Sequence, residues 1–193
     1  MDEPAGILVH SCCASCAGYV LEHLSGRFKP TAFFYNPNIE PEEEYRLRLA
    51  EMAGICAELG IEMIEGEYEP GLWREAVSEL IVLPEGSARC RACYRLRLER
   101  TALEASGRGL GLYTTTLSVS PHKTYRVILE EGRRAAGIRG IRFLEDNFRK
   151  KDGFLKSCIR SRELGLTRQD YCGCLPSLEE ASERRRRRGI NPL

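Results

Sequence analysis

The sequence has no long apolar run. No stretch approaches the roughly 18–20 consecutive apolar residues that a membrane-spanning helix requires. The first residues, MDEPAG, are acidic and lack the basic and apolar regions of a secretory signal peptide. We therefore expect no contact with a membrane and a cytoplasmic location.

Net charge is almost absent as well. The 193 residues include 29 basic and 28 acidic side chains, which gives a formal net charge of +1. The chain as a whole is therefore not a polyanion binder. Internal repeats and low-complexity tracts are also missing, except for five consecutive arginines at residues 184–188. Such a run is usually a solvated or disordered tail, and its functional alternative is phosphate contact with a nucleic acid. The basic residues that would extend such a surface are Arg27, Lys29, Arg139, Arg142, Arg149 and Lys150.

Cysteine, in contrast, is abundant. Seven of the nine cysteines fall in three clusters, HSCCASC at residues 10–16, CRAC at 90–93 and CGC at 172–174. In a reducing compartment, clustered cysteines favour metal or redox chemistry over a structural disulfide framework, and an odd count prevents complete pairing. Of the other two, Cys56 lies on the apolar face of a predicted helix and is expected in the core. Cys158 is isolated, and we expect it to be structural or incidental.

The first cluster follows a short apolar run at residues 7–9, which we interpret as a buried strand. Cys12, Cys13 and Cys16 lie within five positions at its end, where a turn lets neighbouring side chains face one site. The alternative is two buried cysteines that pack as small apolar residues and one spare thiol. His10 is a candidate ligand, a candidate donor to a ligand, or a core histidine with satisfied hydrogen bonds.

The other two clusters are pairs. The gap between Cys90 and Cys93 lets both thiolates reach one metal centre, and their place at a helix amino terminus should lower the thiol pKa. Alone, this pair is also compatible with a zinc half-site, a dithiol or coincidence. The spacing of Cys172 and Cys174 is too tight for a relaxed disulfide, so it suggests a strained, reducible pair or metal ligands. Gly173 gives the backbone freedom for both thiols to converge.

Seven clustered thiols exceed what one zinc ion needs, because zinc is saturated by four ligands and has no redox role. They suggest an iron–sulfur cluster on four of them and a second function for the other three.

The order of the predicted elements favours an α/β fold. Strands are expected at residues 7–10, 30–36, 61–64, 112–116 and 141–144, and helices at 17–24, 41–59, 71–80, 90–107 and 121–136. This alternation predicts a mostly parallel sheet with helices on both faces, and a ligand site beyond the carboxyl ends of the strands. Ser120 and Pro121 are the expected cap and first residue of the last helix. We expect a single domain over residues 1–193, with a cysteine-bearing C-terminal segment at 145–178 packed on it and a basic tail at 179–193.

Taken together, the motifs resemble one family. HSCCASC after the first strand, CRACYRLRL in mid-chain, TTLSVSPHK after a later strand, and DNFRKKDG with RQDYCGC near the end occur in this order in the cobalamin-independent epoxyqueuosine reductases, the QueH family. The resemblance extends from about Ile7 to Ser177. It implies a HUP-like (Rossmann-like) fold and the reduction of epoxyqueuosine to queuosine at the wobble position of tRNA. It also implies tRNA carrying epoxyqueuosine as the partner and an external electron donor.

The resemblance further implies a [4Fe-4S] cluster and, in at least one member, an adjacent mononuclear iron. The residues that match the cluster ligands are Cys12, Cys13, Cys90 and Cys93. Cys172 and Cys174 match a redox-active pair. Cys16 stands where some relatives carry an acidic residue. With the CGC pair, it is our candidate set for the adjacent iron or for thiols that take part in catalysis.

Two further absences narrow the chemistry that this resemblance leaves open. The HUP-like fold that the resemblance implies is shared with ATP pyrophosphatases, which need a Gly/Ser-rich phosphate loop after the first strand. SCCASC stands in that place here, which argues against ATP chemistry. No cobalamin-binding segment is apparent either. His10 and Asp146 are weak candidates for the proton donor. Tyr35, Tyr94 and Tyr171 are candidates to stack on a splayed base, or core residues. The competing functions are a zinc-binding module that interacts with tRNA or protein, and a metal-free thiol–disulfide oxidoreductase.

Overall fold

A parallel sheet forms the centre of the computed structural model, which describes residues 3–189. Its strand order is β3-β2-β1-β4-β5, and every neighbouring pair is parallel. The strands are β1 (Gly6–His10), β2 (Lys29–Phe34), β3 (Met63–Glu65), β4 (Leu112–Thr115) and β5 (Arg142–Phe143). All five predicted strands are present, and the predicted Rossmann-like α/β architecture is confirmed.

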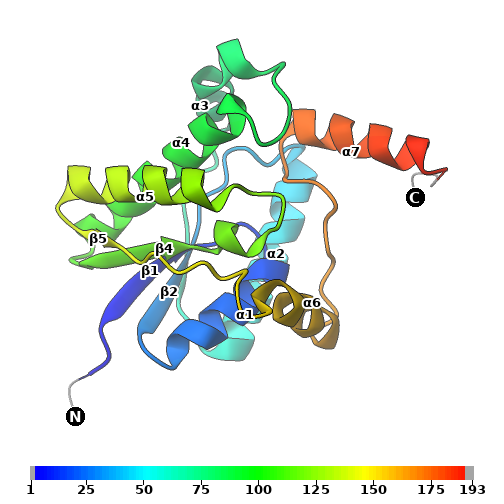
Figure 1. Cartoon of the computed structure of the whole chain (residues 1–193). Helices are drawn as coiled ribbons and strands as arrows, with labels where there is room; N and C mark the ends of the chain where they lie inside the picture. Colours follow the sequence, from blue (N-terminus) through cyan, green and yellow to red (C-terminus); the bar gives the residue numbers. More distant parts are fainter. Residues whose placement is uncertain (1–2, 190–193) are drawn as a thin grey trace.

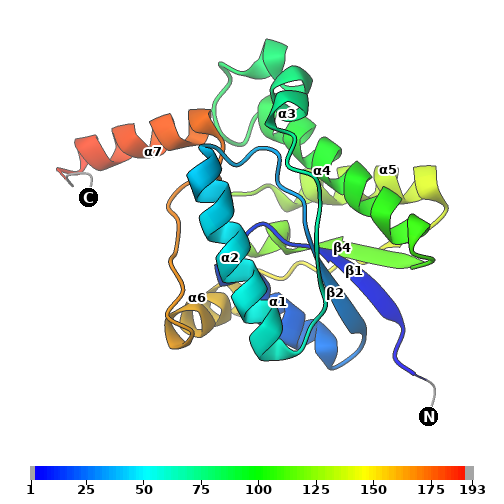
Figure 2. The same ribbon diagram turned by 180° about the vertical axis from the view of Figure 1, so that it is seen from behind.

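Helices cover both faces of this sheet. They are α1 (Ala14–Ser25), α2 (Glu42–Leu59), α3 (Pro70–Ala76), α4 (Ala88–Gly107), α5 (Tyr125–Arg139), α6 (Gly153–Glu163) and α7 (Leu175–Arg187), with 3-10 helices η1 (Ser78–Leu80) and η2 (Thr116–Val119). The helices α4 and α5 lie on one face, and α1, α2 and α6 lie on the other (Figures 1 and 2). None of the helices in residues 3–189 is long and apolar enough to cross a membrane.

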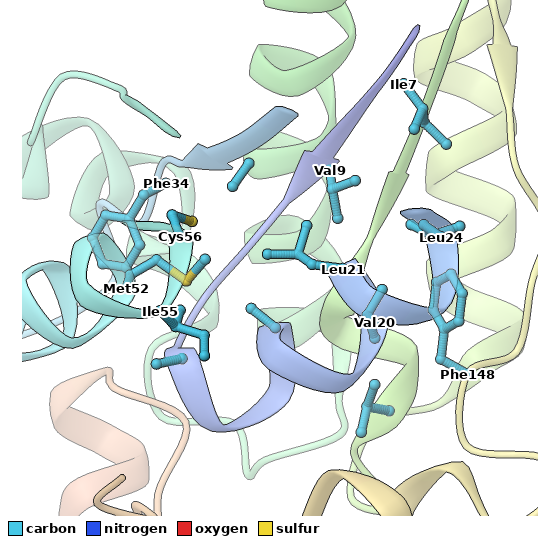
Figure 3. Close-up of a cluster of buried hydrophobic side chains, with 14 of the residues drawn as sticks. Ile7, Val9, Val20, Leu21, Leu24, Phe34, Met52, Ile55, Cys56 and Phe148 are labelled. Carbon is cyan, nitrogen blue, oxygen red and sulfur yellow. The ribbon is translucent and has the colours of Figure 1, made fainter. Parts of the chain in front are cut away.

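The alternation of side chains along β1 explains how the chain builds two cores at once. Ile7 and Val9 point to the face covered by α1 and α2, where they are fully buried (Figure 3). Leu8 points to the opposite face and joins the core under α4 and α5. Because both faces are covered, β1 is apolar throughout its length, as is typical of a central parallel strand.

The chain after β4 differs from the prediction. Ser120 and Pro121 do not begin a helix: Thr124 is the cap, and α5 begins at Tyr125. The reason is local, because Thr115 Oγ1 accepts a hydrogen bond from the backbone N–H of Leu117 at 3.1 Å and so turns the chain into η2 directly after the strand. The helix predicted at residues 71–80 is likewise interrupted, and it forms α3 and η1.

The C-terminal part contains two helices that the sequence did not predict. Helix α6 packs against α1, and α7 extends away from the sheet (Figure 1). The first four residues of the arginine run, residues 184–187, form the last turn of α7. Within the described residues, the segment predicted as a basic tail is therefore helical.

The fold leaves one place where a ligand site is expected. The chain returns to pair β4 on the far side of β1 from β2, so the direction of winding reverses at β1. In open parallel sheets the crevice at such a point, beyond the carboxyl ends of the strands, is where ligands bind. The residue that ends β1 is His10, and HSCCASC continues directly from it.

Candidate active site

The HSCCASC turn delivers its three thiols from the end of β1 into the first turn of α1. Cys13 is the cap of α1, and Cys16 lies within the helix, which begins three residues earlier than predicted. The sulfur of Cys12 lies 3.8 Å from Oγ1 of Thr116, the residue that follows β4. The turn therefore sits in the crevice between β1 and β4.

Hydrogen bonds and burial raise the pKa of two of these thiols, those of Cys12 and Cys13. The hydrogen bond of Cys12 to Cys13, followed by burial, raises the pKa of Cys12 well above its usual range. The hydrogen bond from Cys12 lowers the pKa of Cys13, but its own bond to Cys16 and its burial together raise it. The pKa of each of these two thiols thus depends on its cysteine neighbours in the turn.

The CRAC pair lies in the first turns of α4, as predicted. The backbone N–H of Gly86 donates to the sulfur of Cys90 at 3.2 Å. Contrary to the prediction, the pKa of Cys90 and that of Cys93 are raised, because burial outweighs the helix amino terminus and the neighbouring cations. Cys90 and Cys93 would therefore each have to release a proton to bind a metal.

The CGC pair forms a turn that rests on the loop after β2. The backbone N–H of Glu40 donates to the carbonyl of Gly173 at 2.8 Å, and Arg48 donates to the carbonyl of Cys172 at 3.2 Å. Gly173 has φ of +121°, a conformation that residues with a side chain rarely adopt. Cys174 caps α7, and burial raises the pKa of its thiol to about 11.

These three segments line two adjoining cavities. The larger has a volume of about 450 Å³, and its thiols are those of Cys12, Cys13, Cys16 and Cys172. The smaller is lined by the thiols of Cys90, Cys93, Cys172 and Cys174. Cys172 borders both, so the structure brings all seven clustered cysteines to one region.

All nine cysteines are free thiols, and Cys172 and Cys174 are not joined by a disulfide. Within residues 3–189, no three His, Cys, Asp or Glu side chains stand close enough together to hold a single metal ion. A cluster contains several metal atoms, so its ligands stand farther apart than those of one ion. The assignments of cysteines to a cluster and to an adjacent iron stay predictions.

A buried positive charge lies among the thiols. Arg97 is 1% exposed, and in the described part of the chain no carboxylate pairs with it. It donates from Nη2 to Oδ1 of Asn36 at 2.5 Å and from Nη1 to the sulfur of Cys93 at 3.9 Å. Burial lowers the pKa of Arg97, but the negative charge that the sulfurs of Cys93, Cys12 and Cys172 carry when they are ionised raises it above its usual value.

A second cation, Lys123, lines the larger cavity. Burial lowers the pKa of this amine, but the negative charge of Cys172 and Cys12, when these sulfurs are ionised, raises it above its usual value. Both cations therefore favour negative charge on the sulfurs around them.

The weak candidates for a proton donor do not reach the larger cavity. His10 is fully buried, contacts Oγ1 of Thr115 at 2.8 Å and the carbonyl of Tyr35 at 3.2 Å, and does not line it. Burial and the charge of Arg97 hold the pKa of His10 well below its usual value, so the ring is neutral near pH 7. Asp146 pairs at 3.2 Å with Arg27 and is not among the residues that line either cavity.

The three tyrosines considered for stacking have different environments. Tyr35 is 1% exposed and packs against Phe33, so it is a core residue. Tyr94 is buried at the wall of the smaller cavity. Tyr171 is half-buried, lines the larger cavity and lies under the guanidinium of Arg48 at 5.0 Å. Of the three, Tyr171 has the exposure and the place that stacking requires.

The arginines of α7 form part of the wall of the larger cavity. Arg184, Arg185 and Arg188 line it, together with Arg168 from the segment before the CGC turn. The other basic residues proposed to extend this surface are not among its lining residues. The larger cavity is therefore lined both by thiols and by guanidinium groups.

Cys56 is buried in the core beside Met52 and Ile55, as predicted (Figure 3). Burial raises its pKa to about 11. Cys158 lies half-buried on α6 and lines neither cavity.

Sequence reasoning missed several residues of the site. Arg97 follows Cys93 by four positions on α4, so the helical repeat placed both on one face and was available as a signal. Lys123 stood within the SPHK motif. Asn38 and Trp73, which line the smaller cavity, had no signal in the sequence, because only the folded chain brings them to the thiols.

Comparisons with known proteins fit this geometry. The family model described as epoxyqueuosine reductase QueH matches residues 7–180. The chain belongs to the epoxyqueuosine reductase QueH family. The curated epoxyqueuosine reductase QueH of Thermotoga maritima is 38% identical over 181 residues, which cover 92% of this chain and 93% of that protein. The QueH protein of Acinetobacter baylyi is 35% identical over 191 residues, with 97% and 87% covered. That of Streptococcus pyogenes serotype M1 is 33% identical over 175 residues, with 88% and 69% covered.

The resemblance inferred from the motifs is thus confirmed, and this QueH-family chain is an enzyme of the oxidoreductase class. A non-catalytic zinc module does not fit that membership. The residues matched by the family model include all three cysteine clusters and end within α7.

Proposed function

We propose that this protein reduces epoxyqueuosine to queuosine at the wobble position of tRNA, with electrons passed through an iron–sulfur cluster held by its cysteines. The names of its relatives support the reaction. The observation that carries the proposal is the larger cavity, which is lined both by thiols and by guanidinium groups. Cys12, Cys13, Cys90 and Cys93 are the proposed cluster ligands, after the family motif.

The charge of the site supports an anionic cluster. A guanidinium that is buried without a carboxylate costs free energy unless other negative groups neutralise it. Apart from the neutral side chains of Asn36 and His10, the groups around Arg97 are thiols. Two of these thiols, Cys12 and Cys93, belong to the proposed ligand set. Thiolates that hold iron keep their negative charge, so binding would provide Arg97 with the counter-charge that the free thiols lack.

The chemistry requires two electrons and two protons, and the epoxide oxygen leaves as water. A bound cluster supplies electrons one at a time from an external donor. The pair Cys172 and Cys174 can store the same quantity, because oxidation of two thiols to a disulfide releases two electrons and two protons. Cys16 lies in the same cavity as Cys172 and is the third thiol outside the cluster set. It stays a candidate ligand of an adjacent iron.

The substrate would enter through the larger cavity. Its volume of about 450 Å³ lies within the roughly 300–1,000 Å³ of small-ligand sites, enough for one splayed base. Tyr171 lines this cavity and can stack on that base, and Lys123, which also lines it, can donate a hydrogen bond to an oxygen of the substrate. The arginines of α7 would contact the phosphates of the anticodon loop.

Metal analysis after anaerobic purification tests the cofactor. We expect about four irons and four sulfides per chain, and a fifth iron would support the adjacent ion. Zinc without sulfide would contradict the proposal and favour an interaction module. A metal-free protein that exchanges disulfides through Cys90/Cys93 or Cys172/Cys174 would favour a thiol–disulfide oxidoreductase.

A further inference from the structure

Two buried polar side chains at the smaller cavity lack hydrogen-bond partners. Asn38 is 0% exposed and Trp73 is 2% exposed. Neither amide atom of Asn38, nor Nε1 of Trp73, has a partner within residues 3–189. Both side chains line the cavity whose thiols are those of the CRAC and CGC pairs. The buried N–H groups that have no acceptor thus stand where the sulfurs gather.

Packing fixes both side chains in place. A Cβ atom at Gly173 would lie 3.4 Å from Nδ2 of Asn38, so the amide packs directly against the CGC turn. Trp73 packs with Val77 against Cys93 and Cys174. The indole N–H interacts with the sulfur of Cys93 and lowers the pKa of that thiol, although the two atoms do not meet the geometry of a hydrogen bond. Neither group can turn toward solvent to find a partner.

Such groups require an explanation, because folded proteins leave few buried donors unpaired. Besides its four thiols, the cavity is lined by the acceptors Glu85, Tyr94 and Ser177, and none of these three pairs with Asn38 or Trp73. A protonated thiol is a weak acceptor, whereas a thiolate or an inorganic sulfide carries negative charge and accepts well. Charged sulfurs would therefore give the N–H groups of Asn38 and Trp73 the acceptors that neutral thiols do not provide.

We propose that Asn38 and Trp73 are positioning residues that donate hydrogen bonds to the anionic sulfurs held at Cys90 and Cys93, and that they thereby raise the reduction potential of the bound centre. The inference rests on the proposed iron–sulfur function. Reduction adds negative charge to the sulfurs, so donors that stabilise this charge favour the reduced state. The two residues would tune the centre without ligating it.

In the iron-free protein, Asn38 and Trp73 face neutral thiols and their N–H groups have no good acceptor. Replacing such a side chain by an apolar one of similar shape therefore removes an unpaired polar group and breaks no hydrogen bond. Asn38→Leu should therefore raise the thermal midpoint of the iron-free chain. A polar residue that only maintains the fold would show the opposite change.

The experiment compares the parent protein with Asn38→Leu, Trp73→Phe and a control, Ser161→Ala. Ser161 is 1% exposed, and its hydroxyl likewise has no partner in the described chain, but it lies on α6 and lines neither cavity. Iron and sulfide content is measured first. A redox titration followed by electron paramagnetic resonance then gives the midpoint potential, and the melting of the iron-free proteins is recorded in parallel.

We expect both cavity variants to keep their iron and sulfide but to have a more negative midpoint potential than the parent and Ser161→Ala. Equal potentials in all four proteins would overturn the inference while leaving the proposed function intact. A parent protein without iron and sulfide would overturn both. If Asn38→Leu does not fold, the inference fails for that residue. Trp73→Phe keeps an aromatic ring but removes the N–H group, so its midpoint potential tests the role of the indole N–H separately.

Discussion

Arg97 lies one helical turn beyond Cys93 on α4, and its Nη1 atom is 3.9 Å from the sulfur of that cysteine. The same guanidinium is held in place by Asn36 at 2.5 Å and by the ring of His10 at 3.3 Å. A fixed positive charge is thus built into the thiol site, and it counteracts the rise in thiol pKa that burial causes.

Replacement of Arg97 by methionine should shift iron binding to higher pH. Without the guanidinium, the pKa of Cys93 rises further, so fewer thiols are ionised at neutral pH and metal binding is weaker. Anaerobic reconstitution at a series of pH values measures this. Arg95→Met is the matched control, because Arg95 is on the same helix but pairs with Glu131 at 3.0 Å and lines neither cavity. Identical pH profiles for the two variants would show that Arg97 does not act on the thiols.

Serine variants of Cys90 and Cys56 test the ligand set, with Cys56→Ser as the control. Cys90→Ser should lose most of the iron and sulfide, because a serine hydroxyl is a poor ligand for a cluster. Cys56→Ser should keep both, because Cys56 lies in the core under α2. Iron and sulfide analysis of the two purified variants gives the answer. A Cys90→Ser protein with its full iron content would remove CRAC from the ligand set.

Much of this fold could be predicted from short-range signals. The apolar run at residues 7–9 and the aromatic run at 33–35 marked central strands, and the acidic first turn marked the start of α2. The start of α5 was predicted wrongly, because Ser120 before Pro121 has the sequence of a helix cap. The hydroxyl of Thr115 had already turned the chain by then.

The sequence predicted which cysteines belong to the site, but not the residues that pack around them. Spacing alone grouped the thiols, since CxxC and CGC are local patterns. The contact of Gly173 with Asn38 joins segments more than a hundred residues apart, and such a contact leaves no trace in local sequence. Helix α7 was missed for a similar reason. Its attachment depends on tertiary bonds such as that of Glu180 with Arg89 at 2.9 Å.

The arginines of α7 can be separated by the face on which they lie. Arg184 and Arg188 line the larger cavity, whereas Arg186 and Arg187 do not. Replacing the first two by alanine should weaken tRNA binding and reduce the salt slope by about 1 per lost phosphate contact. Replacing Arg186 and Arg187 removes the same charge and should change binding much less. Fluorescence anisotropy at several salt concentrations distinguishes the two, and equal losses would indicate a diffuse charge effect.

Gly173→Ala should distort the CGC turn. The added Cβ would lie 2.9 Å from Cγ1 of Ile39, and φ of +121° is unfavourable for alanine. We expect a loss of about 1–3 kcal/mol in the free energy of unfolding. Gly54→Ala on α2, where a Cβ meets nothing within 4 Å, should instead stabilise the protein by roughly 0.5–1 kcal/mol. Denaturant unfolding measures both, and an unaffected Gly173→Ala protein would mean that the turn is more tolerant than its packing indicates.

The most direct measurement is a single-turnover reaction on tRNA that carries epoxyqueuosine. Iron-replete protein is reduced with dithionite under anaerobic conditions and mixed with the tRNA, and the nucleosides are then quantified by mass spectrometry. We expect queuosine to form with the parent protein and Cys56→Ser, but not with Cys90→Ser. An epoxide that stays intact in the presence of fully loaded, reduced parent protein would contradict the proposed reaction.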